Sequence, residues 1–346
     1  MERDQLAQLP ELLLPWYQKN ARALPWRQDR EPYRVWLSEI MLQQTRVEAV
    51  KGYYARFLAA LPRVEDLAQA DGETVNKLWE GLGYYSRARN LHRAAKVVAE
   101  QYGGVFPRDY DKIRALPGIG DYTAGAICSI AFDLPTPAVD GNVLRVISRL
   151  TASRACVSEL STKRAIRQQL AEIYPEGRCG EFTQSLMELG ATVCLPNGAP
   201  NCENCPVKCI CKAQEGELWR QLPVLAAKKS RRQAEKTVFI LLCEGKLALL
   251  KRPEKGLLAG LWQLPEAEGE LSATEALAVA EGWGVHPQEL LRQAKKEHIF
   301  THVQWHMTGY YLQCGAQPPQ FTWVSREELE GAYSVPTAFR QFLGNL

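Results

Sequence analysis

Residues 116–131 read LPGIGDYTAGAICSIA, and this stretch decides the fold of the N-terminal half. Gly118 and Gly120 follow a Leu-Pro pair and precede a run of small residues that favours a helix. Glycine takes a positive φ at no steric cost, so the pattern predicts a tight turn between two helices, with backbone N–H groups pointing at a phosphate near the start of the second helix. A plain turn between two packed helices has the same pattern, so the motif alone leaves phosphate binding open.

The sequence around this motif is helical from the N-terminus to about residue 215. Apolar residues recur at spacings of three and four in the segments 37–59, 73–101, 121–132, 141–151, 161–173 and 181–191. Short turns with Gly or Pro separate these segments. We therefore expect an all-α domain.

The pattern changes further along the chain. Residues 223–236, PVLAAKKSRRQAEK, are basic and contain no aromatic residue, as expected of an exposed linker. Residues 237–252, TVFILLCEGKLALLKR, predict two strands around a turn at 244–246, and a helix near 273–282 and strands near 303–313 and 320–324 follow. The C-terminal part is expected to form a separate α/β unit.

The composition limits the class of protein. A chain of 346 residues with 46% apolar and 23% charged residues is ordinary for soluble protein of two or three domains. The formal net charge of +3 does not by itself indicate a nucleic-acid partner, so any phosphate-binding surface has to be local. The first residues are too charged for a signal peptide, and the sequence has no run of eighteen apolar residues. We expect a soluble cytoplasmic protein with no membrane partner.

Ten cysteines in such a chain are not expected to form a disulfide framework. Five of them lie within residues 194–211. Four have the spacing Cys194-x7-Cys202-x2-Cys205-x5-Cys211, and the fifth, Cys209, lies inside the last interval. Four thiolates in one loop bind zinc or an iron–sulfur cluster, and the spacing alone does not choose between these metals. Unliganded buried thiols are the simpler alternative, which we expect for most of the scattered cysteines.

A short acidic motif follows the glycine turn. In AVDGNVLRVISRL, residues 138–150, Asp140 and Asn142 precede an apolar helix, so either side chain is a natural helix N-cap. A capping carboxylate stays ionised, and an ionised carboxylate stabilises a cationic sugar in a transition state. Capping and catalysis are thus compatible at Asp140.

These motifs together resemble a known superfamily. The chain resembles helix-hairpin-helix DNA glycosylases of the endonuclease III type, which carry a [4Fe–4S] cluster. The motifs that carry this resemblance are LPGIGDYTAGAI, VDGNV and the four cysteines. Three further segments narrow the resemblance to adenine DNA glycosylases of the MutY type: LPWR at 24–27, WLSEIMLQQTRVEAV at 36–50 and WEGLGYYSRARNL at 79–91. The resemblance covers residues 1–215 and implies base-excision repair, with a [4Fe–4S] cluster on Cys194, Cys202, Cys205 and Cys211.

The resemblance also implies a role for each matching residue. Glu39 corresponds to the acid that protonates the departing adenine, and Asp140 to the carboxylate that stabilises or briefly bonds the anomeric carbon before water attacks. Tyr122 and Asn142 correspond to groups that support these two carboxylates. By the same resemblance, the substrate-binding positions are Arg22, Leu24, Trp26 and Val47 around the adenine, Gln44 and Tyr84 inside the duplex near 8-oxoguanine, and Gly118 and Gly120 in the hairpin.

The chemistry of the reaction agrees with this assignment. An N-glycosidic bond to adenine breaks slowly because the departing base is a poor anion. A protonated carboxyl group neutralises the base, and an ionised one offsets the oxocarbenium charge. Because the base lies inside a duplex, the enzyme also has to flip it out. Taken singly, Glu39 would be an exposed helical glutamate, and Trp26 and Tyr84 would be core aromatics.

Tyr122 separates two chemistries. Bifunctional relatives have a lysine at this position, and its amine attacks the sugar and later cleaves the strand. A phenol forms no Schiff base, so we expect a monofunctional enzyme that leaves an abasic site.

The C-terminal unit has a resemblance of its own. This unit resembles the Nudix-like recognition domain of the same family through the segment LLKRPEKGLLAGLWQLP at 249–265. A catalytic Nudix box has paired carboxylates, and these are missing from the corresponding segment TEALAVAEGWG at 274–284. Phe300, Thr301 and His302 stand where the family has Phe-Ser-His, the loop that recognises 8-oxoguanine. The sequence departs from the family at Thr301 and in its first cysteine interval, which has seven residues instead of six.

We expect a multidomain chain in which an all-α helix-hairpin-helix core with an iron–sulfur module precedes an α/β Nudix-like domain. The expected boundaries are 1–28 with 136–216 for the cluster module, 29–135 for a six-helix domain, 217–236 for a linker and 237–346 for the Nudix-like domain. The expected partner is double-stranded DNA with adenine opposite 8-oxoguanine or guanine, bound by a monomer at the nucleoid. Expected phosphate contacts are the hairpin backbone and Arg87, Arg89 and Arg93, with Lys228, Lys229, Arg231 and Arg232 as weaker candidates.

Three other functions are alternatives. Tyr122 argues against a bifunctional lyase, and the incomplete Nudix box argues against a nucleotide hydrolase. A non-catalytic DNA-binding protein with a cluster would not need both Glu39 and Asp140.

Overall fold

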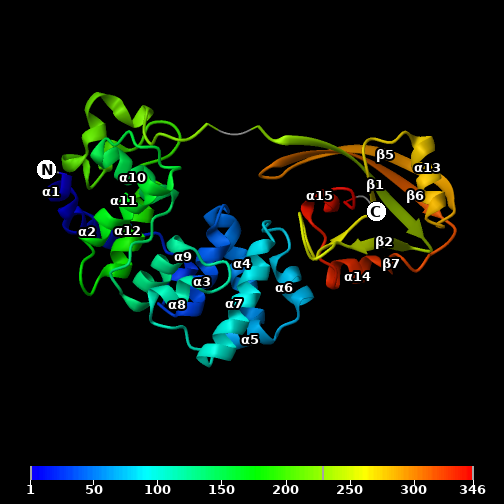
Figure 1. Ribbon diagram of the computed structural model, residues 1–346, viewed down its shortest axis with the longest axis horizontal. Coiled ribbons are helices and arrows are strands. Elements are labelled where there is room, and N and C mark those ends of the chain that lie inside the picture. The colour runs from blue at the N-terminus through cyan, green and yellow to red at the C-terminus, as the bar shows by residue number, and fades with distance from the viewer. Residues whose placement is uncertain (1, 228–229, 345–346) are drawn as a thin grey trace. The chain divides into compact units, whose positions relative to one another are not determined.

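The computed structural model describes residues 2–227 and 230–344 (Figure 1). The chain divides into two compact units, one of residues 1–69 and 90–227 and the other of residues 70–89 and 228–346. In the described part of the chain, no helix is both long enough and apolar enough to cross a membrane.

The first unit is helical, which confirms the predicted all-α fold. Its helices are α1 (Glu2–Ala7), α2 (Leu9–Asn20), α3 (Pro32–Leu42), α4 (Val47–Ala60), α5 (Val64–Gln69), most of α7 (Ser86–Tyr102), α8 (Tyr110–Arg114), α9 (Asp121–Ala126), α10 (Gly141–Thr151), α11 (Leu160–Ala171) and α12 (Cys179–Thr192). Shorter 3-10 or π-helical turns are η1 (Pro25–Arg27), η2 (Ile127–Ala131), η3 (Cys202–Asn204), η4 (Lys208–Ile210) and η5 (Lys212–Arg220).

Two of the predicted helical segments are divided by turns. Segment 37–59 breaks after α3, where Gln44 has a φ of 57°. Segment 73–101 breaks between α6 (Gly72–Trp79) and α7, where Gly81, Gly83 and Tyr84 all have positive φ. The apolar spacing continues across both turns, so periodicity alone did not reveal them.

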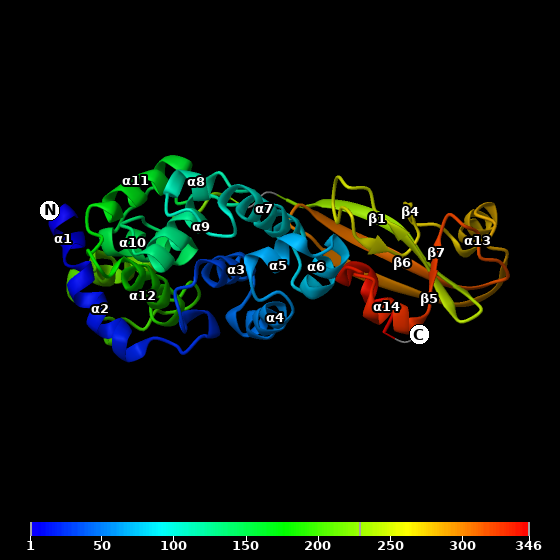
Figure 2. The same ribbon diagram turned by 90° about the horizontal axis from the view of Figure 1, so that it is seen from below.

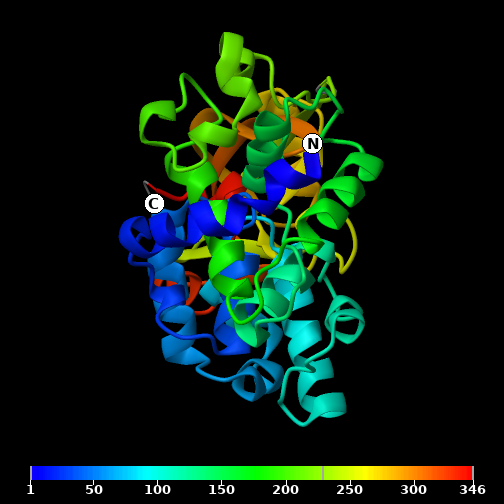
Figure 3. The ribbon, with the colours of Figure 1, turned by 90° about the vertical axis from the view of Figure 1, so that its left-hand side faces the viewer.

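The N-terminal helices pack against helices that lie more than a hundred residues later in the sequence. Figure 3, which faces this unit, shows the N-terminal segment beside the later helices α10 to α12. Burying a leucine side chain contributes about 1.5–3 kcal/mol, so this core stabilises the long-range arrangement. It includes Leu6, Leu9, Leu13 and Leu14 of α1 and α2 with Val143, Ile147, Leu170, Phe182 and Leu186.

Side-chain caps fix the start of the two helices that carry the predicted carboxylates. At α3, Glu31 accepts hydrogen bonds from the backbone N–H groups of Tyr33 and Arg34, and Pro32 occupies the first turn. At α10, Asp140 accepts a hydrogen bond from the backbone N–H of Val143 at 2.8 Å. A cap of this kind stabilises a helix by about 1 kcal/mol.

The second unit is built on a seven-stranded sheet. The strand order is β3-β2-β1-β6-β5, with β4 paired to β1 and β7 to β2, and β1 runs parallel to β6. The elements are β1 (Arg232–Cys243), β2 (Lys246–Lys251), β3 (Trp262–Gln263), β4 (Glu266–Glu268), α13 (Ala273–Gly282), β5 (Pro287–Ile299), β6 (Val303–Cys314), β7 (Thr322–Val324), α14 (Arg326–Gly331) and α15 (Thr337–Arg340). The predicted strands around 244–246 and the helix at 273–282 are confirmed.

Helices cover both faces of this sheet, because its central strands are apolar on both sides. On β1, Val238 and Ile240 pack in a core with α14 and α15, while Phe239 and Leu241 pack in a second core with α13. Figure 2 shows α13 and α14 beside these strands. The sequence did not reveal β5, an edge strand whose residues are mostly exposed and polar. Residues 232–236, predicted to be linker, belong to β1.

Residues 70–89 are part of the second unit. Glu80 accepts hydrogen bonds from the backbone N–H of Val335 at 2.9 Å and from Nε of Arg340 at 3.1 Å. The Ser334 hydroxyl donates to the carbonyl of Asn76 at 3.2 Å. The polar groups at the end of α6 are therefore satisfied by the C-terminal segment.

Replacing Glu80 by Ala removes the acceptor that Val335 and Arg340 share. We expect the free energy of unfolding to fall by about 1–3 kcal/mol, because partly buried donors lose their partner. Urea unfolding followed by circular dichroism measures this change. Glu217→Ala is the control, since Glu217 forms an exposed pair with Arg220 and its loss should cost less than about 0.5 kcal/mol. Equal losses in the two variants would contradict the assignment.

Candidate active site

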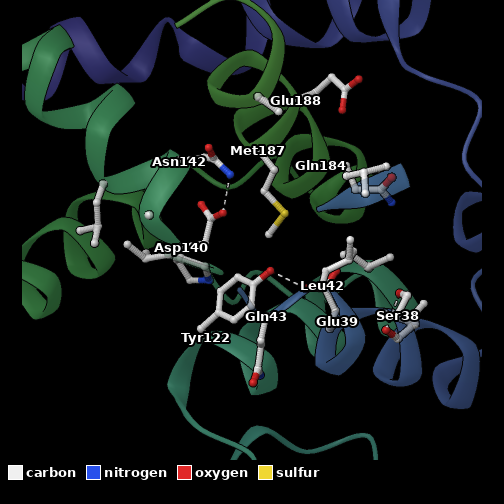
Figure 4. Close-up of a pocket in the computed structure, with 18 of the residues that line it drawn as sticks. Ser38, Glu39, Leu42, Gln43, Tyr122, Asp140, Asn142, Gln184, Met187 and Glu188 are labelled. Atoms are coloured by element: carbon white, nitrogen blue, oxygen red, sulfur yellow. Dashed lines mark hydrogen bonds between the residues drawn. The ribbon is translucent and has the colours of Figure 1, made fainter. Parts of the chain in front are cut away.

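A pocket of about 750 Å³ lies within the helical unit, among residues of α3, α9, α10, α11 and α12 (Figure 4). It collects nine of the residues singled out in the sequence, although they are spread over 120 positions. These are Arg22, Leu24, Trp26, Glu39, Gln44, Val47, Tyr122, Asp140 and Asn142.

Glu39 is a buried carboxyl group on a buried helix. It is 6% exposed and lies among apolar residues of α3 that are equally inaccessible. The Tyr122 hydroxyl donates a hydrogen bond to Oε2 of Glu39. Burial raises the pKa of Glu39 to about 7, while the Tyr122 hydrogen bond lowers it and nearby Asp140 raises it. Near neutral pH, Glu39 is therefore able to hold and release a proton.

Asp140 has a more polar setting than Glu39. Oδ1 accepts from the backbone N–H of Val143 and Oδ2 accepts from the side-chain amide of Asn142, each at 2.8 Å. Burial raises the pKa of Asp140, and these two hydrogen bonds oppose the rise because they stabilise the ionised form. In Figure 4 the Tyr122 ring lies between the two carboxyl groups. Asp140 therefore combines capping with a position in the pocket.

The segment leading to Asp140 is held by close backbone contacts. A Cβ on Gly125 would lie 2.3 Å from the carbonyl oxygen of Pro137, and one on Gly190 would lie 2.5 Å from Cβ of Asn142. The Tyr174 hydroxyl accepts a hydrogen bond from the backbone N–H of Ala138 at 3.3 Å. Only glycine permits these approaches, so the position of Asp140 is set by α9 and α12 as well as by its own helix.

The pocket wall also contains residues that the sequence analysis missed. Glu188 is fully buried and accepts from Nε of Arg22 at 2.6 Å and from Nη2 of Arg27 at 2.8 Å. Although burial raises the pKa of Glu188, the bonds from both arginines leave it below the ordinary value. Gln184, whose Oε1 accepts from the Tyr17 hydroxyl at 2.7 Å, lines the pocket as well. A glutamate within the apolar run LMELG was the available signal for Glu188.

The hairpin lies in the same unit but does not line the pocket. Gly118 has a φ of 76°, and a Cβ there would lie 2.5 Å from Cβ of Asn90. Gly120 has a φ of −102° and is the residue before α9, so the expected positive φ is found at Gly118 alone.

The remaining predicted DNA contacts lie elsewhere. Tyr84 is 46% exposed and belongs to the second unit, where Phe300, Thr301 and His302 form the turn between β5 and β6. Arg87 is buried and donates to backbone carbonyls, which makes it unsuitable as a phosphate contact. Arg89 donates to the carbonyl of Ala259, and Arg93 to the side chain of Asn90. Arg232 is the first residue of β1 and Arg231 precedes it, whereas Lys228 and Lys229 lie outside the described residues.

The four predicted ligand cysteines line one smaller cavity in the first unit, and Cys209 is exposed outside it. Burial, and then the proximity of Cys194, Cys211 and Cys202, raises the pKa of the Cys205 thiol to about 12. Among the described residues no three His, Cys, Asp or Glu side chains meet at the spacing of a single metal ion. Four thiolates are a ligand set that both a zinc ion and an iron–sulfur cluster accept, so the donor chemistry of this cavity fits either group.

Helix α10 connects the cysteine loop with the pocket. Arg145 donates to Oδ1 of Asn142 and to the carbonyl of Cys194, each at 2.9 Å. One turn later, Arg149 donates to Sγ of Cys194 at 3.3 Å and to the carbonyl of Leu195 at 2.8 Å. Hydrogen bonds therefore run without a gap from Asp140 to a predicted cluster ligand.

The raised pKa of Glu39 predicts a pH-dependent stability. The folded pKa of about 7 exceeds the ordinary value of 4.5, so the contribution of Glu39 is complete below pH 4.5 and is lost as the pH rises through 7. One pKa unit corresponds to about 1.4 kcal/mol, so the native chain should lose up to about 3 kcal/mol more than Glu39→Gln between pH 5 and pH 8. Urea unfolding at both pH values measures the difference. Parallel pH profiles of the two proteins would refute the assignment.

Comparisons with known proteins are consistent with both units. Residues 37–176 match the family of HhH-GPD superfamily base excision DNA repair proteins, and residues 237–345 match the NUDIX domain. The chain is similar to a solved thermostable thymine-DNA glycosylase, with a TM-score of 0.55 and 30% identity over 62% of this chain and 97% of that one.

Two curated relatives extend this similarity over nearly the whole chain. The adenine DNA glycosylase of Homo sapiens is 36% identical, covering 95% of this chain and 72% of that protein. The adenine DNA glycosylase of Schizosaccharomyces pombe is 33% identical, covering 92% of this chain and 85% of that protein. With the helical core, the paired carboxyl groups in its pocket and a C-terminal Nudix-like unit, the chain belongs to the adenine DNA glycosylase family.

Proposed function

We propose that this protein is a monofunctional DNA glycosylase that hydrolyses the N-glycosidic bond of adenine opposite 8-oxoguanine or guanine in duplex DNA. The observation that carries the proposal is the buried Glu39 carboxyl group, with a pKa of about 7, in the same pocket as Asp140. Two carboxyl groups with different environments are what acid-assisted glycosidic cleavage requires.

The reaction follows from these two environments. Glu39 donates its proton to a ring nitrogen of the flipped adenine, so the base leaves as a neutral molecule when the bond to the anomeric carbon breaks. The bonding electrons leave with the base, and the sugar becomes an oxocarbenium ion. The Asp140 carboxylate offsets that positive charge until water adds to the anomeric carbon and loses a proton.

Other pocket residues determine which base enters. Leu24 and Trp26 supply a buried apolar wall, and the Trp26 ring is fixed by an edge contact with Tyr54 at 5.5 Å between centroids. Glu188 holds Arg22 and Arg27 beside this wall. Tyr122 has no amine, so the pocket has no group at this position that can form a Schiff base with the sugar. These features favour simple hydrolysis that leaves an abasic site.

Cys194, Cys202, Cys205 and Cys211 would hold the [4Fe–4S] cluster. When bound, the cluster supplies a redox-active centre and four iron–sulfur bonds that cross-link the loop. The residues of the chain itself link this loop to the pocket, since Arg145 and Arg149 bond to the backbone or thiol of Cys194. We assign residues 1–28 with 136–216 to the cluster module. Of residues 29–135, expected to form the six-helix domain, we assign 29–69 and 90–135 to it, because residues 70–89 belong to the second unit.

The second unit supplies recognition of the opposite base. The Thr301 hydroxyl lies in an exposed turn between β5 and β6, while Phe300 packs on Trp305 with ring centroids 4.8 Å apart. The Thr301 hydroxyl is an exposed hydrogen-bond donor, and the contact of Phe300 with Trp305 anchors its turn. This arrangement suits contact with 8-oxoguanine. The substitution of threonine for the serine usual in the family retains the hydroxyl.

Single-turnover assays on duplexes with adenine opposite 8-oxoguanine test the activity. We expect the native protein to yield strand breaks only after alkali treatment, because hydrolysis leaves an abasic site. Asp140→Asn should reduce the rate at least a hundredfold, since a carboxylate is lost beside the cationic sugar; loss of one group that stabilises transition-state charge costs roughly 10²–10³ in rate. Breaks without alkali would indicate a lyase, and no product from the native protein would refute the proposal.

A matched pair of cysteine variants tests the cluster. Cys211→Ser should lose most of the bound iron and the visible absorption, because one of four thiolates is missing. Cys209→Ser should keep both, since Cys209 is exposed and does not line the cavity. Iron analysis after anaerobic purification gives the comparison. The reverse result would make Cys209 the fourth ligand.

A further inference from the structure

Helix α11 has a core face and a separate face toward the active-site pocket. Ile166 and Leu170 are buried in the core formed with α1, α2, α10 and α12. The four pocket-lining residues of α11 fall at positions i, i+3, i+4 and i+7, which places them on one side of the helix. They are Leu160, Lys163, Arg164 and Arg167, and we call this set the α11 face.

The α11 face carries more positive charge than its surroundings neutralise. Lys163 and Arg164 are exposed, and within residues 2–227 and 230–344 neither side chain has a hydrogen-bond or ion-pair partner. Leu160, at the start of the helix, is 56% exposed, which is unusual for a large apolar side chain beside a pocket. A cationic surface with an apolar end at the entrance of a pocket attracts a polyanion.

Arg167 connects the α11 face to the hairpin. Its guanidinium stacks on the Tyr110 ring, 4.4 Å from the centroid, and lies 4.0 Å from Oδ1 of Asp121. Asp121 directly follows the Gly118–Gly120 turn and also pairs with Arg114. The negative charge of Asp121 is thus neutralised by two arginines, and Lys163 and Arg164 stay available on the same side of the helix.

We propose that the α11 face binds backbone phosphates of the DNA strand whose adenine enters the pocket. The inference rests on the proposed function, because a flipped base brings its own strand, and not the opposite one, to the pocket entrance. Lys163 and Arg164 neutralise the phosphates beside the flipped nucleotide, and Leu160 packs against the adjoining sugar. Such contacts position the strand and carry no sequence information.

The double variant Lys163→Ala/Arg164→Ala tests the electrostatic part. Binding to an adenine:8-oxoguanine duplex is measured over a series of salt concentrations, with Asp140→Asn in every protein to keep the substrate intact. Each phosphate contact adds about 0.9 to the slope of log K against log salt concentration, so the double variant should lose about 2 from its slope. Lys19→Ala/Lys96→Ala removes two exposed lysines outside the pocket lining and should keep the native slope. An unchanged slope in the first variant, or equal losses in both, would overturn the proposal.

A second experiment tests the choice of strand. Single phosphates around the adenine, and around the base opposite, are replaced by uncharged methylphosphonates. We expect neutral linkages on the adenine strand to weaken binding by the native α11 face and to have no added effect in the double variant. If neutral linkages on the opposite strand, and not those on the adenine strand, weakened binding by the native protein but not by the double variant, the strand assignment would be refuted. Base release by the native protein is scored separately, so a failure of the proposed function is distinguishable from a failure at the α11 face.

Discussion

The hydrogen bond from the Tyr122 hydroxyl to the buried Glu39 carboxyl group is the interaction on which the site depends. Placing a carboxyl group inside a helical core disfavours its ionised form, and a single hydroxyl donor offsets only part of that cost. The result is a pKa of about 7 where an exposed glutamate would be fully ionised. The burial that makes Glu39 costly for stability is therefore what makes it useful as an acid.

The rest of the helical unit positions a second carboxylate against the first. Gly125 and Gly190 allow other backbone and side-chain atoms to approach residues 137–142 closely, and the Tyr174 hydroxyl holds one of the intervening amides. Arg145 extends this support to the cysteine loop. Because α1 and α2 pack into the same core as α10 and α12, the N-terminal segment contributes to a site assembled from distant parts of the chain.

Charge is distributed differently in the two units. In the pocket, buried carboxylates either meet arginines, as at Glu188, or keep a raised pKa, as at Glu39. In the second unit, Glu80 meets Arg340, and Glu73 accepts from the Trp262 indole at 3.1 Å, so residues 70–89 are held by the C-terminal fold through polar contacts. The Lys163 and Arg164 side chains of the α11 face have no such partners within the described chain, which is why they suit an external polyanion.

The sequence by itself determined the helical and α/β halves, the glycine turn, the cap at Asp140 and the cysteine spacing, because these depend on local periodicity and on residues close in sequence. It also indicated Glu39, Tyr122, Asp140 and Asn142 through a family resemblance. It did not reveal β5, since an exposed polar edge strand has no apolar alternation, nor Glu188, since the paired Arg22 is 166 positions away. Only the tertiary structure decided the pKa of Glu39 and the joining of residues 70–89 to the C-terminal unit. It also decided that the α11 face lines the active-site pocket. Desolvation and charge proximity depend on which distant residues meet, and no local pattern records that.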